Sequence, residues 1–302
     1  MHASDALDRS IERTGSIACV GLDPRPSLLP ASLRHSVTAS HGPGAEGVAE
    51  AFRISNEAII DAVAGHCAVI KPQAACYEAY GVPGWRALEA TVAHAEAAGV
   101  PVILDAKRGD IGSTAAHYGQ MAFGGAPGLD DEPISGMDAT WLTVNPYLGV
   151  DGIEPVLGDS NAGLFVITKT SNPSSGELQD TPSGAGTVAD TVADLVHGWG
   201  ATRLGDCGLS DIGAVVGATY PDHARALRER MPDTFFLVPG YGAQGGDAAG
   251  AVAGLRSDGR GIVVSSSRGI TGAWQATGTD DWAGAARAAL DDMNRALDAV
   301  RR

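Results

Sequence analysis

The segment richest in chemically useful side chains is 105–114, which reads DAKRGDIGST. Asp105 and Lys107 are two residues apart, so on an extended strand their side chains would point to the same side. Asp110 adds a second carboxylate beyond them. Nearby carboxylates favour the charged form of a lysine, so the spacing predicts that Lys107 is an ammonium group able to donate a proton. A salt bridge that merely orients the loop is the simpler alternative.

Lysines are scarce in this chain, and their positions are alike. The 21 basic residues include three lysines, Lys71, Lys107 and Lys169, and each follows or closes a short apolar run. Arginine keeps its proton near neutral pH, whereas lysine can release one. A bias of composition toward arginine explains the scarcity but not the shared position, so we interpret the lysines as functional residues at the ends of strands.

The elements that must position these residues form an alternating pattern. Near-continuous apolar runs predict strands buried on both faces at 17–22, 67–70, 101–104, 139–144, 164–168, 212–217, 235–238 and 261–264. Amphipathic or alanine-rich stretches predict helices at 47–63, 85–98, 113–121, 187–199, 223–230 and 282–300. Eight such units favour a (β/α)8 barrel that occupies residues 1–302 as a single domain. An open, doubly wound sheet is the alternative fold.

Two segments are longer than ordinary loops. Residues 124–138 and 172–186 are rich in Gly, Pro, Ser and Asp, and we expect surface insertions there that could act as lids.

A glycine-rich turn near the end of the chain predicts a phosphate site. Residues 239–245, PGYGAQG, follow the seventh predicted strand and open with Pro239, and the eighth strand is followed by Arg268. A dinucleotide fold would place such a turn early in the chain, whereas the loops after strands 7 and 8 of a barrel often bind phosphate through backbone N–H groups. Gln244 and Arg268 would add side-chain donors. Asp23, after the first strand, either accepts hydrogen bonds from a sugar diol or stiffens a turn before proline.

Composition excludes several classes of protein. The net charge is −15 and basic runs are absent from the sequence, which excludes a nucleic-acid or membrane-surface binder. The cysteines are far apart and the histidines lack metal-ligand spacing, so we expect free thiols and no metal site. The first residues alternate in charge and resemble no signal peptide, so we expect a cytoplasmic protein.

Together these motifs resemble the orotidine 5′-phosphate decarboxylase family, and in particular its longer bacterial branch. The resemblance extends from about residue 17 to residue 270. It rests on 21–24 (GLDP), 70–73 (IKPQ), 105–111 (DAKRGDI), 169–173 (KTSNP), 239–247 (PGYGAQGGD) and 267–268 (SR).

The resemblance implies a cofactor-free decarboxylation of orotidine 5′-monophosphate to UMP and CO2. Lys107 would stabilise the charge that develops at C6 of the pyrimidine and then protonate that carbon, while Asp105 would face the departing carboxylate. Lys71 and Asp110 would complete an alternating network of charges. For the substrate, the resemblance implies that Asp23 and Lys71 hold the ribose, Ser171 the base, and Gln244 with Arg268 the phosphate.

The resemblance also implies a homodimer with shared sites, because the residues that match Asp110 and Thr114 reach into the partner's site in that family. It assigns no role to Lys169. Two other functions stay open: a Mg²⁺-dependent sugar-phosphate decarboxylase or aldolase of the same barrel group, and a non-catalytic barrel that only binds a nucleotide.

Overall fold

Eight parallel strands form the centre of the molecule. The structure is a computed structural model that describes residues 1–242 and 245–301. The strands are β1 (Ala18–Leu22), β2 (Val69–Pro72), β3 (Ile103–Arg108), β6 (Trp141–Val144), β7 (Gly163–Lys169), β10 (Ser210–Val216), β11 (Thr234–Val238) and β12 (Ile262–Ser266). They follow the order β2-β1-β12-β11-β10-β7-β6-β3, and each of the eight matches a predicted strand.

The sheet closes on itself. β2 and β3 lie at the two edges of the strand order, and two parallel bridges join them, Ile70 with Val102 and Gln73 with Asp105. The barrel prediction is therefore confirmed, and the open-sheet alternative is wrong. The second bridge closes the barrel beside Asp105.

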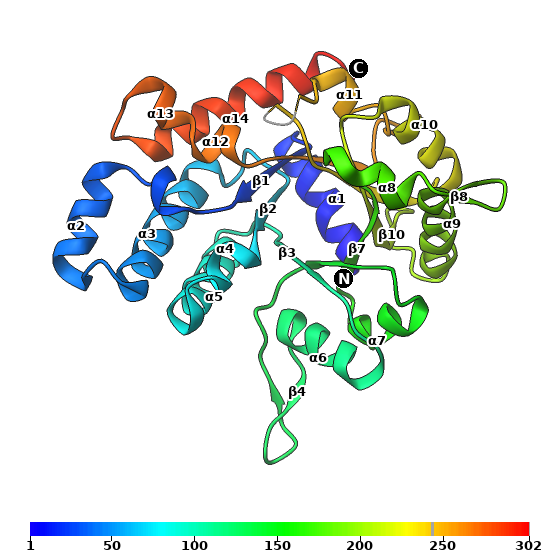
Figure 1. Ribbon diagram of the computed structural model, residues 1–302, viewed down its shortest axis with the longest axis horizontal. Helices are drawn as coiled ribbons and strands as arrows, with labels where there is room; N and C mark the ends of the chain where they lie inside the picture. Colours follow the sequence, from blue (N-terminus) through cyan, green and yellow to red (C-terminus); the bar gives the residue numbers. More distant parts are fainter. Residues whose placement is uncertain (243–244, 302) are drawn as a thin grey trace.

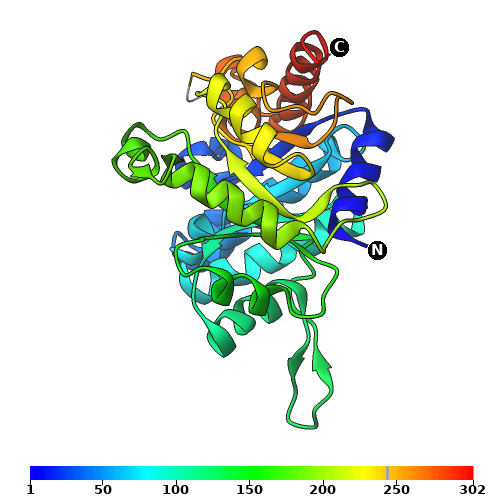
Figure 2. The same ribbon diagram turned by 90° about the vertical axis from the view of Figure 1, so that its right-hand side faces the viewer.

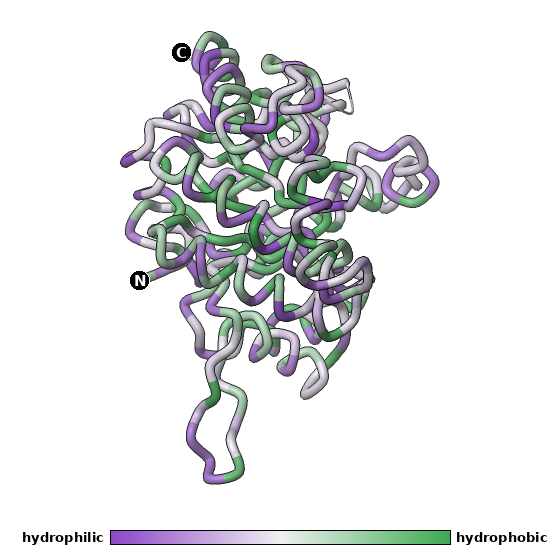
Figure 3. Tube along the Cα trace, turned by 90° about the vertical axis from the view of Figure 1, so that its left-hand side faces the viewer, coloured by the Kyte–Doolittle hydropathy of each residue, from purple (hydrophilic) through white to green (hydrophobic). Residues whose placement is uncertain are grey.

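Helices surround the strands (Figure 1). The six predicted helices are present as α3 (Ala45–Val63), α5 (Gly81–Ala97), α6 (Gly112–Phe123), α9 (Val188–Gly200), α10 (Pro221–Arg230) and α14 (Trp282–Asp298). Further helices are α2 (Ala31–His41), α4 (Ala74–Glu78), α7 (Glu154–Leu157), α11 (Ala248–Ala251), α12 (Arg268–Thr271) and α13 (Ala273–Thr277). α3 buries Phe52, Ile59 and Val63 on one stripe, as an amphipathic helix does against a core. Apolar segments accordingly run through the middle of the trace in Figure 3.

Helix α1 (Ala3–Thr14) was not predicted, and it packs at the N-terminal end of the barrel. Its Ala3 and Leu7 join an inner cluster that includes Trp141 and Phe165, whose rings stack at 4.5 Å. Asp211, the second residue of β10, accepts hydrogen bonds from the Ser4 backbone and hydroxyl at 2.9 and 2.8 Å. This helix also buries polar residues, and a search for apolar periodicity therefore overlooks it.

Both long segments are insertions at the surface, as predicted. Residues 124–138 contain the antiparallel pair β4 (Ala126–Pro127) and β5 (Pro133–Ile134), which projects away from the barrel (Figures 1 and 2). Residues 172–186 contain α8 (Gly176–Gln179) and β8 (Pro182–Ser183), and β8 pairs with β9 (Gly186–Thr187).

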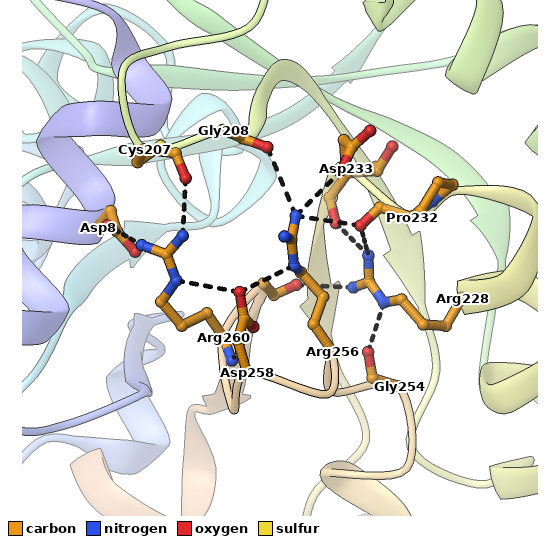
Figure 4. Close-up of polar contacts among 12 residues, drawn as sticks. Asp8, Cys207, Gly208, Arg228, Pro232, Asp233, Gly254, Arg256, Asp258 and Arg260 are labelled. Atoms are coloured by element: carbon orange, nitrogen blue, oxygen red, sulfur yellow. Dashed lines mark hydrogen bonds and ion pairs between the residues drawn. The ribbon is translucent and has the colours of Figure 1, made fainter.

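Three arginines, Arg228, Arg256 and Arg260, connect the segments that lead into β10, β11 and β12, at the N-terminal face of the barrel (Figure 4). Arg228 donates to the carbonyls of Gly254, Thr234 and Gly261 at 2.8, 2.7 and 2.9 Å. Arg260 pairs with Asp8 of α1 at 2.8 Å. This network links the helical layer to the barrel on the face opposite the lysines.

The four cysteines are free, as predicted. Over residues 1–242 and 245–301, none of the helices combines the length and the apolar character that crossing a membrane requires.

Candidate active site

Charged side chains from two adjacent strands meet at the C-terminal face of the barrel. Lys71 lies in β2, and Asp105 and Lys107 lie in β3. Because all eight strands are parallel, their C-terminal ends share one face, where active sites of such barrels are found. Lys71 and Asp105 are only 5% and 6% exposed. A buried ion pair of this kind is costly to maintain unless its hydrogen bonds are satisfied.

The carboxylate of Asp105 is held by four donors. Its Oδ2 accepts from Lys71 Nζ at 2.7 Å and from Gln73 Nε2 at 3.0 Å. Its Oδ1 accepts from Lys107 Nζ at 2.5 Å and from Thr143 Oγ1 at 2.9 Å. Each oxygen thus has one cationic and one neutral donor, and these fix the orientation of the carboxylate.

The two ammonium groups keep Asp105 ionised. Burial disfavours its charged form, but Lys71 and Lys107 outweigh burial and hold the pKa of Asp105 below its usual value. For Lys71 burial likewise disfavours the charge, but Asp105 and Asp23 outweigh it and raise the pKa of Lys71. Both groups are therefore charged at neutral pH, as the alternating network requires.

Asp105 and Lys107 meet through a bulge rather than along a regular extended strand. In the ladder with β6, Leu104 pairs with Leu142 but Arg108 pairs with Val144. Lys107 itself has φ 49°, in the left-handed region that non-glycine residues seldom adopt. The predicted proximity is confirmed, but the extended geometry expected for it is wrong, because the chain turns at Lys107.

Lys107 is the accessible member of the cluster. Its side chain is 46% exposed, against 6% for Lys71 and 8% for Asp105. An ammonium group held at one side by a carboxylate and open at the other can contact a ligand and transfer a proton to it.

The expected phosphate loops follow β11 and β12 at the same face. The carbonyl of Pro239 accepts from Ala218 N at 2.9 Å, and Gly240 and Gly242 have φ 99° and 70°, which glycine adopts without strain. Arg268 begins α12 with an exposed side chain that makes no ion pair within the described part of the chain. Gln244, the other expected donor, lies outside the described residues. Arg268 is thus available to an anion.

Asp23 and Ser171 follow β1 and β7. Oδ1 of Asp23 is buried and has no hydrogen-bond partner in residues 1–242 and 245–301, so it is left to accept a hydrogen bond from a hydroxyl group of a ligand. Ser171 packs closely against Gly217, where an added Cβ would lie 2.9 Å from the serine nitrogen.

Asp110 and Thr114 do not join the cluster within this chain. Asp110 accepts from the Ile111 backbone at 2.8 Å, and across the described residues it forms no ion pair with either lysine of the cluster. Thr114 is exposed on the first turn of α6.

Lys169 has different partners from those of Lys71 and Lys107. Its Nζ pairs with Asp180 of the 172–186 insertion at 2.5 Å and lies 5.0 Å from the centre of the Tyr220 ring. The side chain is 1% exposed. The shared strand-end position predicted from the sequence is confirmed, but Lys169 connects an insertion to the barrel.

Sequence reasoning missed two members of the cluster, Gln73 and Thr143. Gln73 comes two residues after Lys71, and Thr143 is a lone hydroxyl in an apolar run. Their positions at the ends of predicted strands were the only sign in the sequence that they could join the site. In residues 1–242 and 245–301, no group of three or more His, Cys, Asp or Glu side chains is arranged to hold a metal ion.

A closed barrel of parallel strands with an ammonium–carboxylate–ammonium cluster at its C-terminal face defines a barrel enzyme with a polar active site. The chain belongs to the orotidine 5′-phosphate decarboxylase / HUMPS family, whose family model matches residues 18–278.

Relatives agree with this membership over nearly the whole chain. An orotidine 5′-phosphate decarboxylase of Rhodopirellula baltica is 45% identical over 306 residues, which cover 98% of this chain and 99% of the relative. An orotidine 5′-phosphate decarboxylase of Haloarcula marismortui is 44% identical over 284 residues, which cover 93% of this chain and 91% of the relative. The solved structure of Leishmania donovani OMP decarboxylase aligns with a TM-score of 0.76 at 32% identity, over 100% of this chain and 99% of that chain.

Proposed function

We propose that this chain decarboxylates orotidine 5′-monophosphate to UMP and CO2, the last step of de novo pyrimidine nucleotide synthesis. The observation that carries the proposal is the Lys71–Asp105–Lys107 cluster, in which one buried carboxylate holds two ammonium groups and one of these is open to a ligand. Family membership and the names of the relatives support the substrate.

The chemistry requires stabilisation of an electron pair on carbon. When the bond between C6 and the carboxylate breaks, CO2 leaves and the electron pair stays at C6. The Lys107 ammonium stabilises that pair and then donates a proton to C6, and the resulting amine regains a proton from solvent. Asp105 repels the substrate carboxylate more than the neutral CO2 that forms, so its charge favours the transition state over the bound substrate. The proposed step needs neither a metal nor an organic cofactor.

The remaining site residues bind the nucleotide in this proposal. Arg268, with Gln244 and the turn that starts at Pro239, binds the phosphate, which needs positive charge in a chain of net charge −15. Asp23 and Lys71 hold the ribose hydroxyls, and Ser171 contacts the base. The unpaired Oδ1 of Asp23 supports its part.

We also propose a homodimer in which Asp110 and Thr114 complete the site of the partner subunit. Within the described residues, neither side chain forms a hydrogen bond or an ion pair with the cluster of its own chain. Beside them, Ile111, Tyr147 and Leu148 expose apolar side chains, as a surface covered by a second copy would.

A single domain comprising residues 1–302 and a cytoplasmic location, in keeping with the free thiols, complete the proposal.

The direct assay follows the loss of orotidine 5′-monophosphate spectrophotometrically, with and without a chelator. The proposal expects turnover that a chelator leaves unchanged. Activity abolished by the chelator would favour the Mg²⁺-dependent alternative, and binding of UMP without CO2 release would favour the non-catalytic one.

Mixing subunits tests the shared site. Lys107→Ala and Asp110→Ala homodimers should each be nearly inactive, whereas their heterodimer regains activity because one of its two sites keeps both residues. Subunit exchange verified by differently tagged chains, with no recovery of activity, would contradict the shared site.

A further inference from the structure

The single residue of β6 that faces the bulge of β3 is Thr143. Between the ladder pairs Leu104–Leu142 and Arg108–Val144, β3 contains residues 105–107 and β6 contains only Thr143. Asp105 and Lys107 therefore lie opposite one side chain of the neighbouring strand.

The hydroxyl group of Thr143 contacts both of them. Its oxygen accepts a hydrogen bond from the Lys107 backbone N–H at 2.9 Å, and its proton is donated to Asp105 Oδ1, also at 2.9 Å. Asp105 Oδ1 is the same oxygen that accepts from Lys107 Nζ. One hydroxyl thus fixes the backbone of Lys107 and the carboxylate that receives its ammonium group.

Burial makes this arrangement difficult to replace. Thr143 is 1% exposed, so water has little access to take over either hydrogen bond. Lys107 adopts a left-handed backbone conformation that persists only where its surroundings impose it. The bond from its N–H to Thr143 is the contact best placed to impose it.

We infer that Thr143 is a positioning residue for the decarboxylation, which holds the left-handed turn at Lys107 and aims its ammonium group at the reacting carbon. The inference rests on the proposed function. Thr143 itself contacts neither the substrate nor the transferred proton, and it acts through Lys107 and Asp105.

The test compares Thr143→Val, which keeps the shape but loses the hydroxyl, with Thr143→Ser, which keeps the hydroxyl. We expect kcat to fall about 10²-fold in Thr143→Val, because a small misplacement of a catalytic group costs about that much in rate. KM should stay within about threefold, because the phosphate and ribose contacts are intact. Thr143→Ser should recover most of kcat. Thr168→Val is the matched control, because Thr168 is also buried near the end of β7, and within the described residues its hydroxyl donates only to the carbonyl of Val166. Its kcat should match the parent.

Amide hydrogen exchange at Lys107 provides a readout that does not depend on activity. Its N–H should be protected in the parent and in Thr143→Ser but exchange faster in Thr143→Val, or in Thr143→Ala if the valine variant does not fold. A kcat loss below tenfold in a folded valine variant, no recovery by serine, or unchanged exchange would each overturn the inference. A parent chain that does not decarboxylate the substrate would contradict the proposed function instead, and the exchange measurement would still decide the role of Thr143.

Discussion

At the scale of single residues, the electrostatics of the site depend on Asp105. Its carboxylate is the common partner of Lys71 and Lys107, so it sets where both ammonium groups lie. A buried ion pair contributes little when intact, but removing one partner is costly because it leaves an uncompensated charge. Without the carboxylate of Asp105, Lys71 would carry such an uncompensated charge, since it is almost fully buried.

Asp105→Asn should therefore destabilise the protein in a pH-dependent way. At pH 7 we expect the free energy of unfolding to fall by about 3–5 kcal/mol. The folded-state pKa of Asp105 lies below its unfolded value of about 4, so its stabilising effect is complete above that pH and is lost as the pH falls through the folded-state pKa. Urea titrations at several pH values should show the deficit of Asp105→Asn narrowing in acid. A deficit that stays constant down to about pH 3 would contradict this role of the ionised carboxylate.

At the scale of elements, the 172–186 insertion is held to the end of β7 through its middle. Lys169 pairs with Asp180, and Gln179 exchanges two hydrogen bonds with Thr170 at 2.9 and 2.8 Å. Thr187 then caps α9 through a reciprocal contact with Asp190. These contacts position Ser171, which lies just after β7, relative to the end of that strand.

Variants of the Lys169–Asp180 pair should differ in a defined order. Lys169→Met leaves Asp180, which is 44% exposed and can be hydrated, whereas Asp180→Asn leaves a buried ammonium group without its carboxylate. We therefore expect Asp180→Asn to have the lower Tm of the two, and both variants to be cut faster by protease within 172–186. The opposite order of Tm values would show that the buried charge of Lys169 does not depend on Asp180.

At the scale of the whole molecule, the two ends of the barrel have different roles. The C-terminal face contains the Lys71–Asp105–Lys107 cluster, and the N-terminal face is closed by α1 and by the arginine network of Figure 4. Burial, with the nearby Arg256, lowers the pKa of Arg228 to about 9, and the Arg228 guanidinium also lies 3.8 Å above the Phe236 ring. This end of the molecule should set stability rather than rate.

Arg228→Met tests that division. It leaves several buried carbonyls without a donor, so we expect a loss of about 3 kcal/mol in the free energy of unfolding, with kcat unchanged at temperatures where the variant stays folded. Arg225→Met on the same helix is the control. Its pair with Asp222 is exposed, and its stability should change by less than about 1 kcal/mol. A large loss of kcat in folded Arg228→Met would show that the two ends are coupled.

Most of the fold and the main charges of the site were predictable from local sequence. Strands buried on both faces leave apolar runs, and the spacing of Asp105 and Lys107 is visible in the sequence. The bulge at Lys107 was not predictable, because it depends on the register between β3 and β6, which the sequence does not display. Thr143 and Gln73 were missed for the same reason, since each contacts Asp105 from a strand or loop that neighbours β3 in the barrel but is distant in sequence.

The most direct test of the proposed chemistry replaces the accessible ammonium group. Lys107→Ala should still fold and bind UMP, because the phosphate and ribose contacts lie elsewhere, but its rate of orotidine 5′-monophosphate decarboxylation should fall by at least about 10³-fold. A rate within about tenfold of the parent, in a preparation that binds UMP normally, would contradict the assignment of Lys107 as the group that stabilises and protonates C6.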